Sequence, residues 1–256
     1  MGCEYDRDRS QIIEGGIFIS RVRSHALETA VDAIMNKINN YELLSGDVVS
    51  DAELSGELGM SRTPVREAMM QLINDGILQR TSTRVVVKPL TLSDIYEILE
   101  IREALEIASA SRILRRGGLT DGEQEQLRSI HEQLCKSVQE KQFDENFSQD
   151  ARFHQTIIEF GGNLRMLAIS KTFDRQVQRL RFLTMVTPER YTGTVAEHQA
   201  ILDALCSADR QAVKAAIRRH LRAAADNFSD ILEDPRWNRM ARGLHDLTSG
   251  DILCGK

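Results

Sequence analysis

The chain has 256 residues, of which 41% are hydrophobic and 28% are charged, and its formal net charge is −5. This composition suffices for one or two ordinary globular cores. No apolar run approaches the roughly 20 residues that cross a membrane, and residues 1–20 lack the apolar core of a signal peptide. The four cysteines form no CxxC pair, so free thiols in the cytoplasm are favoured over a disulfide or zinc framework.

The pattern predicts a flexible leader at residues 1–20, then a helix over residues 24–39 and two more helices around a tight turn. The first of these two covers residues 51–58 and ends at Gly59, because glycine enters a left-handed turn without steric penalty. Ser61 is expected to supply an N-cap oxygen to the second, and Pro64 lies in its first turn, where a missing N–H costs nothing.

The second helix of this pair has one apolar and one basic face. Val65, Met69 and Leu72 are predicted to be buried, whereas Arg62 and Arg66 project from its N-terminal half on the other side. A helix that presents arginines from its first turns, braced by a short preceding helix, is typical of a helix-turn-helix recognition element.

A small hairpin, or wing, is predicted next, with strands that begin at Ile77 and Arg84 on either side of a turn at residues 81–83. From Gly76 to Leu90 there are three Lys/Arg residues and no acid, which is the local field that phosphate contact needs. The alternative is a plain helical hairpin with solvated arginines. DNA binding is favoured over this alternative because four signals agree: the glycine of the turn, the N-cap serine, the proline of the first turn and the spacing of the arginines.

The segment LGMSRTPVREAMMQL, followed by DGIL, resembles the winged helix of the GntR family of bacterial transcription regulators. By that resemblance Arg62 and Arg66 meet guanines in the major groove, where arginine is bidentate to O6 and N7. The DNA-binding residues implied in this way are Ser61, Arg62, Thr63, Arg66 and Arg84. Two features depart from the family pattern: Ala52 stands near a commonly basic position, and Thr81-Ser82-Thr83-Arg84 replaces a glycine-containing wing tip.

The remainder of the chain is helical in pattern as far as about Leu232. Helices are predicted at residues 93–115, 121–140, 143–161, 163–185, 194–206 and 209–231. Because the connections are short, neighbouring helices should be antiparallel. The expected fold is therefore mainly α, with a winged helix-turn-helix domain at residues 21–90 and an antiparallel all-α bundle of about six helices at residues 91–232. The tail at residues 233–256 has no assigned role.

Four polar residues occupy positions on the apolar stripes of this bundle. Asp150 and His154 are four residues apart on one helix face, and His198 and His220 lie on the stripes of the last two helices. A buried, unpaired carboxylate is costly, and a cation would resolve the cost. One carboxylate and three imidazoles suit a divalent transition metal such as Zn²⁺ or Ni²⁺. The alternatives are hydrogen-bonded core histidines and a plain Asp150–His154 ion pair.

Several motifs between Thr91 and about Asp230 resemble the FCD effector domain of the FadR subfamily within GntR. They are IREALE at 101–106, Asp150-x3-His154, GGN at 161–163, Glu197-His198 and His220. The resemblance implies that the aspartate and three histidines bind a metal whose coordination a small carboxylate effector completes. It also implies that Arg102 binds that carboxylate, with an interhelical salt bridge as the alternative role. Members that bind fatty acyl-CoA lack this ligand set, so a small organic acid is expected.

The chain is thus predicted to be a transcription regulator, here a repressor, that binds a palindromic double-stranded operator as a homodimer under effector control. In a first alternative the metal itself is the signal. A second alternative, a metalloenzyme, has Glu197 as its nearest base, and that side chain should point about a quarter turn away from His198. The remaining histidines, His25, His131 and His245, are interpreted as surface residues.

Overall fold

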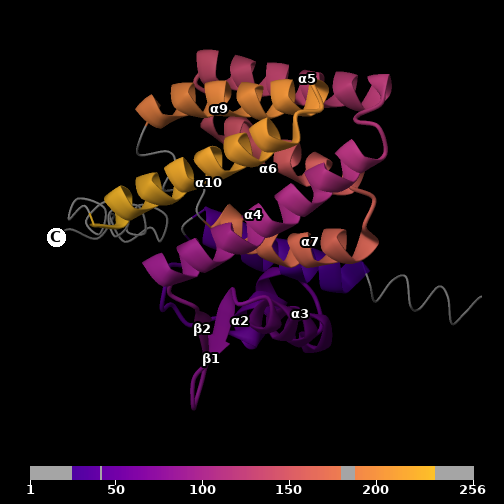
Figure 1. Ribbon diagram of the computed structural model, residues 1–256. Coiled ribbons are helices and arrows are strands. Elements are labelled where there is room, and N and C mark those ends of the chain that lie inside the picture. The colour runs from indigo at the N-terminus through magenta and orange to yellow at the C-terminus, as the bar shows by residue number, and fades with distance from the viewer. Residues whose placement is uncertain (1–24, 41, 180–187, 234–256) are drawn as a thin grey trace, which may run out of the picture. The chain divides into compact units, whose positions relative to one another are not determined.

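The computed structural model describes residues 25–40, 42–179 and 188–233 (Figure 1). Tertiary contacts divide the chain into two compact units, Met1–Pro89 and Leu90–Lys256. The leader at residues 1–20, the tail from residue 234 and His245 lie outside the described residues. Among the helices that are described, none is both long and apolar enough to cross a bilayer.

The first unit is a winged helix-turn-helix fold. A helix at residues 25–39 is followed by α2 (Asp51–Glu57), α3 (Arg62–Asn74) and the antiparallel strands β1 (Leu78–Arg80) and β2 (Val85–Val87). Leu78 is paired with Val87, and Val48 forms an isolated bridge to Val86 on the other edge of β2. The buried core of this unit includes Ile34, Val65, Met69, Leu72 and Ile77. The apolar face predicted for α3 is therefore confirmed.

The turn between α2 and α3 matches the prediction except at its cap. Gly59 has a φ of 60°, the left-handed conformation expected of it. Ser61 occupies the N-cap position of α3, but its side chain makes no capping hydrogen bond, so that prediction was wrong. An N-cap oxygen accepts from the N–H of the second or third helical residue, and the third here is Pro64, which has no N–H.

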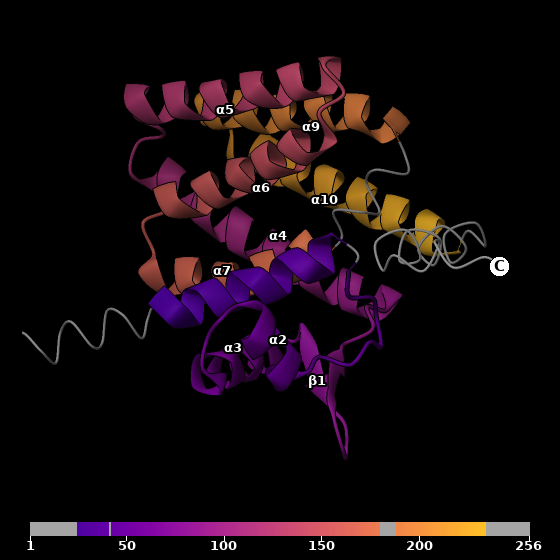
Figure 2. The same cartoon turned by 180° about the vertical axis from the view of Figure 1, so that it is seen from behind.

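The second unit is a bundle of six helices within the described residues, as predicted (Figures 1 and 2). They are α4 (Leu92–Arg115), α5 (Asp121–Gln139), α6 (Phe143–Phe160), α7 (Leu164–Gln178), α9 (Pro188–Cys206) and α10 (Arg210–Glu233). Helix α4 packs against α6, α7 and α10, while α9 packs against α5 and α10. Helix α9 begins six residues before the predicted start at residue 194, because a proline is tolerated at the first helical position.

The start of α4 and the junction between α6 and α7 are specified by local chemistry. Thr91 begins α4 with a capping box, and Asn163 caps α7 by accepting from the N–H groups of residues 165 and 166. Gly161 is needed for close packing, since a Cβ there would lie 2.7 Å from the Cβ of Ser109 on α4. Arg112 Nε also donates to the Gly161 carbonyl at 2.6 Å. These contacts set α4, which carries Arg102 and Glu106, against α6, which carries Asp150 and His154.

Candidate functional site

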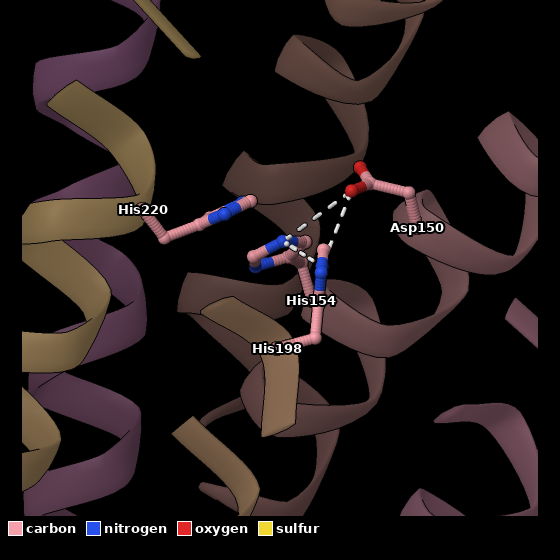
Figure 3. A group of neighbouring side chains, drawn as sticks. All are labelled: Asp150, His154, His198 and His220. Atoms are coloured by element: carbon pink, nitrogen blue, oxygen red, sulfur yellow. Dashed lines mark hydrogen bonds and ion pairs between the residues drawn. The ribbon is translucent and has the colours of Figure 1, made fainter. Parts of the chain in front are cut away.

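Three helices of the bundle bring Asp150, His154, His198 and His220 together (Figure 3). Asp150 and His154 come from α6, His198 from α9 and His220 from α10. One ligand atom from each of the four residues lies within 4.8 Å of the others. His198 Nε2 lies 3.2 Å from Asp150 Oδ1 and 3.0 Å from His154 Nε2. The four residues singled out from helical spacing therefore form one cluster.

Each histidine of the cluster has its Nδ1 atom engaged by an oxygen outside the cluster. His154 Nδ1 pairs with Glu106 Oε2 at 2.8 Å, and His220 Nδ1 pairs with Glu197 Oε2 at 2.9 Å. His198 Nδ1 pairs with the backbone carbonyl of Thr194 at 2.7 Å. An imidazole whose Nδ1–H donates to an acceptor carries its lone pair on Nε2. This is the arrangement that orients histidines toward a metal ion.

Burial and charge favour the protonation states that a metal ion requires. Burial, reinforced by the nearby Arg102 guanidinium, lowers the pKa of His154 from its usual 6.5 to about 3. Burial also lowers the pKa of His220. Burial alone would raise the pKa of Asp150, but His198, His154 and Arg102 outweigh it and hold that pKa well below its usual range. Neutral His154 and His220 imidazoles beside the ionised Asp150 carboxylate are ready for a divalent cation.

Arg102 lies beside the cluster on α4. Its Nε donates to Glu106 Oε1 at 2.8 Å, and its Nη2 is 3.7 Å from Asp150 Oδ2 on α6. The interhelical ion pair considered from sequence is thus present. Arg102 also lines a cavity of about 70 Å³ together with Asp150 and His220. The other lining residues are Leu99, Asn146, Phe147, Val177, Thr194, Ala224, Asn227 and Phe228.

Two carboxylates that support the cluster were not identified from sequence. Glu106 has a fully buried side chain that bridges Arg102 and His154. Its pKa falls to about 2, because His154 and Arg102 outweigh the effect of burial. The signal was available, since Arg102 and Glu106 are four residues apart on the inner face of one helix. Glu197 was considered as part of the Glu197-His198 motif and as the base of a metalloenzyme. Its contact with His220 depends on how α9 packs against α10.

The interpretation of His131 as a surface residue was wrong. Its relative exposure is 7%, and its Nε2 lies 3.1 Å from the carbonyl of Val195. Helix α5 packs against α9, so the α5 face that carries His131 is covered, which the spacing within α5 alone did not indicate. His25 is exposed, as predicted.

The arginines predicted to read DNA lie exposed on α3, and a carboxylate of α2 bridges them. The exposed fractions of the Arg62 and Arg66 side chains are 54% and 63%. Asp51 Oδ1 accepts from Arg62 Nη2 at 2.6 Å, and Asp51 Oδ2 accepts from Arg66 Nε. These contacts lower the pKa of Asp51 to about 2. Nothing in the spacing of α2 singled out Asp51 for this role.

The other residues predicted to contact DNA are also exposed: Ser61 and Thr63 at the start of α3, and Arg84 at the wing. The Arg84 backbone N–H donates to Thr81 Oγ1 at 3.2 Å, and the Thr81 N–H donates to the Arg84 carbonyl at 2.8 Å. The wing turn is therefore closed by threonine where glycine is usual in the family that the segment resembles.

Comparison with known proteins yields two family matches that together cover most of the chain. Residues 26–86 match the family described as bacterial regulatory proteins, gntR family, and residues 97–223 match the FCD domain. The HTH-type transcriptional repressor RspR of Escherichia coli (strain K12) is 27% identical over 74% of this chain and 82% of its own. The HTH-type transcriptional regulator YdhC of Bacillus subtilis (strain 168) is 23% identical over 78% of this chain and 90% of its own.

Solved structures show the same fold. The Escherichia coli protein McbR/YncC aligns with a TM-score of 0.67 over 80% of this chain and 97% of its own. Its sequence identity is 16%, so the likeness concerns the fold alone.

Proposed function

Because the chain belongs to the gntR family of bacterial regulatory proteins and carries an FCD domain, we propose that it is a DNA-binding transcription regulator whose operator affinity responds to a small carboxylate at a metal site. The observation that carries the metal proposal is the shared orientation of the three histidines, each with Nδ1 engaged from outside the cluster.

The donor set fits a divalent transition metal such as Zn²⁺ or Ni²⁺. His154, His198 and His220 would each provide Nε2, and Asp150 would provide a carboxylate oxygen. When bound, the metal would act as a Lewis acid that attracts a carboxylate ligand. Two ligand atoms at roughly 2.0–2.2 Å from one ion are at most about 4.4 Å apart. The four ligand atoms lie within 4.8 Å of one another, so small side-chain movements would let them share an ion.

The cavity beside the cluster supports a small organic acid as the effector. A volume of about 70 Å³ is well below the roughly 300 Å³ at the lower end of ordinary ligand pockets, so a long acyl chain is disfavoured. Arg102 contributes a guanidinium to the wall of this cavity, and such a group suits a carboxylate. Leu99, Phe147 and Phe228 provide apolar wall for a short carbon skeleton.

At the other unit, Arg62 and Arg66 would read guanines in the major groove, and Ser61, Thr63 and Arg84 would contact the backbone or nearby bases. A homodimer would place two such faces on a palindromic operator, as a two-fold protein requires. Effector binding would alter operator affinity only if the effector binds the DNA-competent and DNA-incompetent states unequally. Such a protein would act in the cytoplasm as a repressor.

The chain is not an enzyme, since the gntR family consists of regulatory proteins and the relatives reported above are named as transcription regulators. Glu197, the base considered for a metalloenzyme, is instead engaged by His220 at 2.9 Å. A metal-responsive regulator remains the second candidate, because four protein ligands would already hold an ion firmly without an organic partner.

Elemental analysis of the purified protein tests the metal site. We expect about one transition metal per chain, lost in His154→Ala and His220→Ala but retained in His131→Ala, which removes a buried histidine outside the cluster. A wild type that is empty and cannot be reloaded with Zn²⁺ or Ni²⁺ would reject the site.

Thermal shift with acetate, lactate, malonate and succinate tests the effector. Stabilisation of the metal-loaded protein that is lost in Arg102→Ala would support a carboxylate effector. If none of these acids stabilises the protein while DNA affinity follows metal occupancy, the metal-responsive candidate replaces it.

A further inference from the structure

Asp51 is the first residue of α2, and its single carboxylate contacts both arginines of the proposed reading face. Oδ1 accepts from Arg62 Nη2 at 2.6 Å, and Oδ2 accepts from Arg62 Nε at 3.2 Å and from Arg66 Nε. Ser50 caps the same helix by accepting from the Glu53 N–H at 3.3 Å, so the carboxylate extends from an ordered turn. One anion thus fixes two long cations that belong to a different helix.

These contacts leave a defined part of each guanidinium free for DNA. Asp51 engages the Nε–Nη2 edge of Arg62, which leaves Nη1 and the second hydrogen of Nη2 at the tip. Arg66 is held through Nε, which leaves both Nη groups. An arginine loses side-chain entropy when it is ordered. Here much of that ordering precedes DNA binding, and the two free tips match the paired acceptors O6 and N7 of guanine.

We infer that Asp51 determines the specificity of the DNA-binding face. Asp51 positions Arg62 and Arg66 for guanine and weakens their attraction to phosphate elsewhere. The inference rests on the proposal that these two arginines read bases. Asp51 acts through the arginines and is therefore a positioning residue.

The charge of the winged unit supports the proposal that Asp51 weakens non-specific attraction to phosphate. Residues 21–88 contain 8 Lys/Arg and 9 Asp/Glu, a net charge of −1, so non-specific attraction to DNA is already small. Asp51 offsets one of the two arginine charges at the reading face. Without Asp51, the two flexible arginines could bind any nearby phosphate. With their positions fixed by Asp51, they bind most strongly where the guanine acceptors O6 and N7 meet the free ends of the guanidinium groups.

Asp51→Asn tests the inference, with Glu53→Gln as the matched control. Glu53 is an exposed acid in the same first turn of α2, and its replacement removes the same charge while leaving the contacts of Asp51 in place. The DNA probes are a duplex selected from a random-sequence pool with the full-length wild type and a shuffled duplex of equal composition. Fluorescence anisotropy at two salt concentrations gives both affinities.

We expect Asp51→Asn to strengthen binding to the shuffled duplex and to reduce the ratio of specific to non-specific affinity by about tenfold. Glu53→Gln should strengthen both affinities in parallel and keep the ratio. Asp51→Glu, which retains the carboxylate, should recover most of the ratio. Equal ratios for Asp51→Asn and Glu53→Gln would overturn the inference.

Arg62→Ala separates this inference from the proposed function. If Arg62→Ala also keeps the wild-type ratio, base reading by this face is wrong. If Arg62→Ala loses the ratio and Asp51→Asn keeps it, only the role of Asp51 is wrong. Thermal unfolding verifies that each variant folds. Should Asp51→Asn fail to fold, Asp51→Ser decides, because it also removes the carboxylate and should lower the ratio in the same way.

Discussion

Both units place a carboxylate between two nitrogen-bearing side chains, but in opposite environments. Asp51 bridges Arg62 and Arg66, whose side chains are more than half exposed. Glu106 bridges Arg102 and His154 with a side chain that is fully buried. Exposed ion pairs contribute about 0–1 kcal/mol to folding, whereas breaking a buried pair costs roughly 3–5 kcal/mol. Substitutions at the exposed pair should therefore change recognition alone, whereas substitutions at the buried pair should also lower the stability of the bundle.

The largest expected effect concerns the buried cluster. His198 is fully buried and lies between Asp150 and His154, so His198→Ala should abolish the stabilisation that the metal provides. At metal concentrations 100-fold above Kd, that stabilisation is about 2.7 kcal/mol, and the cavity adds a further loss. Chemical denaturation with and without added Zn²⁺ measures it. A variant that Zn²⁺ still stabilises as strongly as the wild type would remove His198 from the site.

On the exposed face, Arg62→Ala should change recognition and leave folding intact. We expect a loss of about 1–3 kcal/mol on the selected duplex, with relaxed preference at one base position, because one bidentate guanine contact is removed. Arg84→Ala at the wing is the comparison, and it should weaken all sequences alike. Anisotropy titrations on a set of single-base variants of the duplex distinguish the two patterns. Uniform weakening by Arg62→Ala would assign it to the phosphate backbone.

The bridging role of Glu106 gives a smaller, graded effect. Glu106→Gln keeps the shape of the side chain but removes the charge that orients His154 and pairs with Arg102, so metal affinity should fall about 10–100-fold. Chelator competition measures this affinity. Glu103→Gln on the same helix is the control, since Glu103 pairs with Arg218 on α10 and is partly exposed. Similar losses in both variants would mean that charge on α4, not orientation of His154, sets the affinity.

The smallest expected effect is a pH dependence of the metal-free protein. The pKa of His154 is about 3 when folded and close to 6.5 when unfolded, so the unfolded state binds the proton first as the pH falls. Stability should therefore be complete above pH 6.5 and decline below it, by about 2 kcal/mol between pH 7 and pH 5. Denaturation of the chelated protein at both pH values measures the change. His154→Gln should flatten the curve, and an unchanged curve would assign the dependence to other groups.

The DNA-binding motif could be predicted from sequence because its signals are local. Gly59, Pro64 and the apolar stripe of α3 act within a few residues of one another, and the structure matches each of them. The Ser61 cap is absent, and Pro64 removes one of the two N–H groups that an N-cap oxygen can reach. The face of α3 that carries Arg62 and Arg66 follows from helical spacing alone.

The composition of the cluster of Asp150, His154, His198 and His220 could also be predicted, because polar residues on apolar stripes are costly wherever they occur. Its supporting contacts could not. The pairing of Glu197 with His220 and the burial of His131 depend on how α9 packs against α10 and α5. Helical periodicity indicates which face of a helix is buried, but not which neighbour covers it.

The sequence by itself determined the winged motif, the helical bundle and the four residues of the cluster, since each follows from spacing along one helix or turn. Only the tertiary structure decided that Asp51 bridges the two arginines, that Glu106 links Arg102 to His154, and that every histidine of the cluster has an acceptor at Nδ1. The physical reason is range: hydrogen bonds and ion pairs form between atoms about 3 Å apart, and which helices meet at that distance is decided by packing of the whole unit.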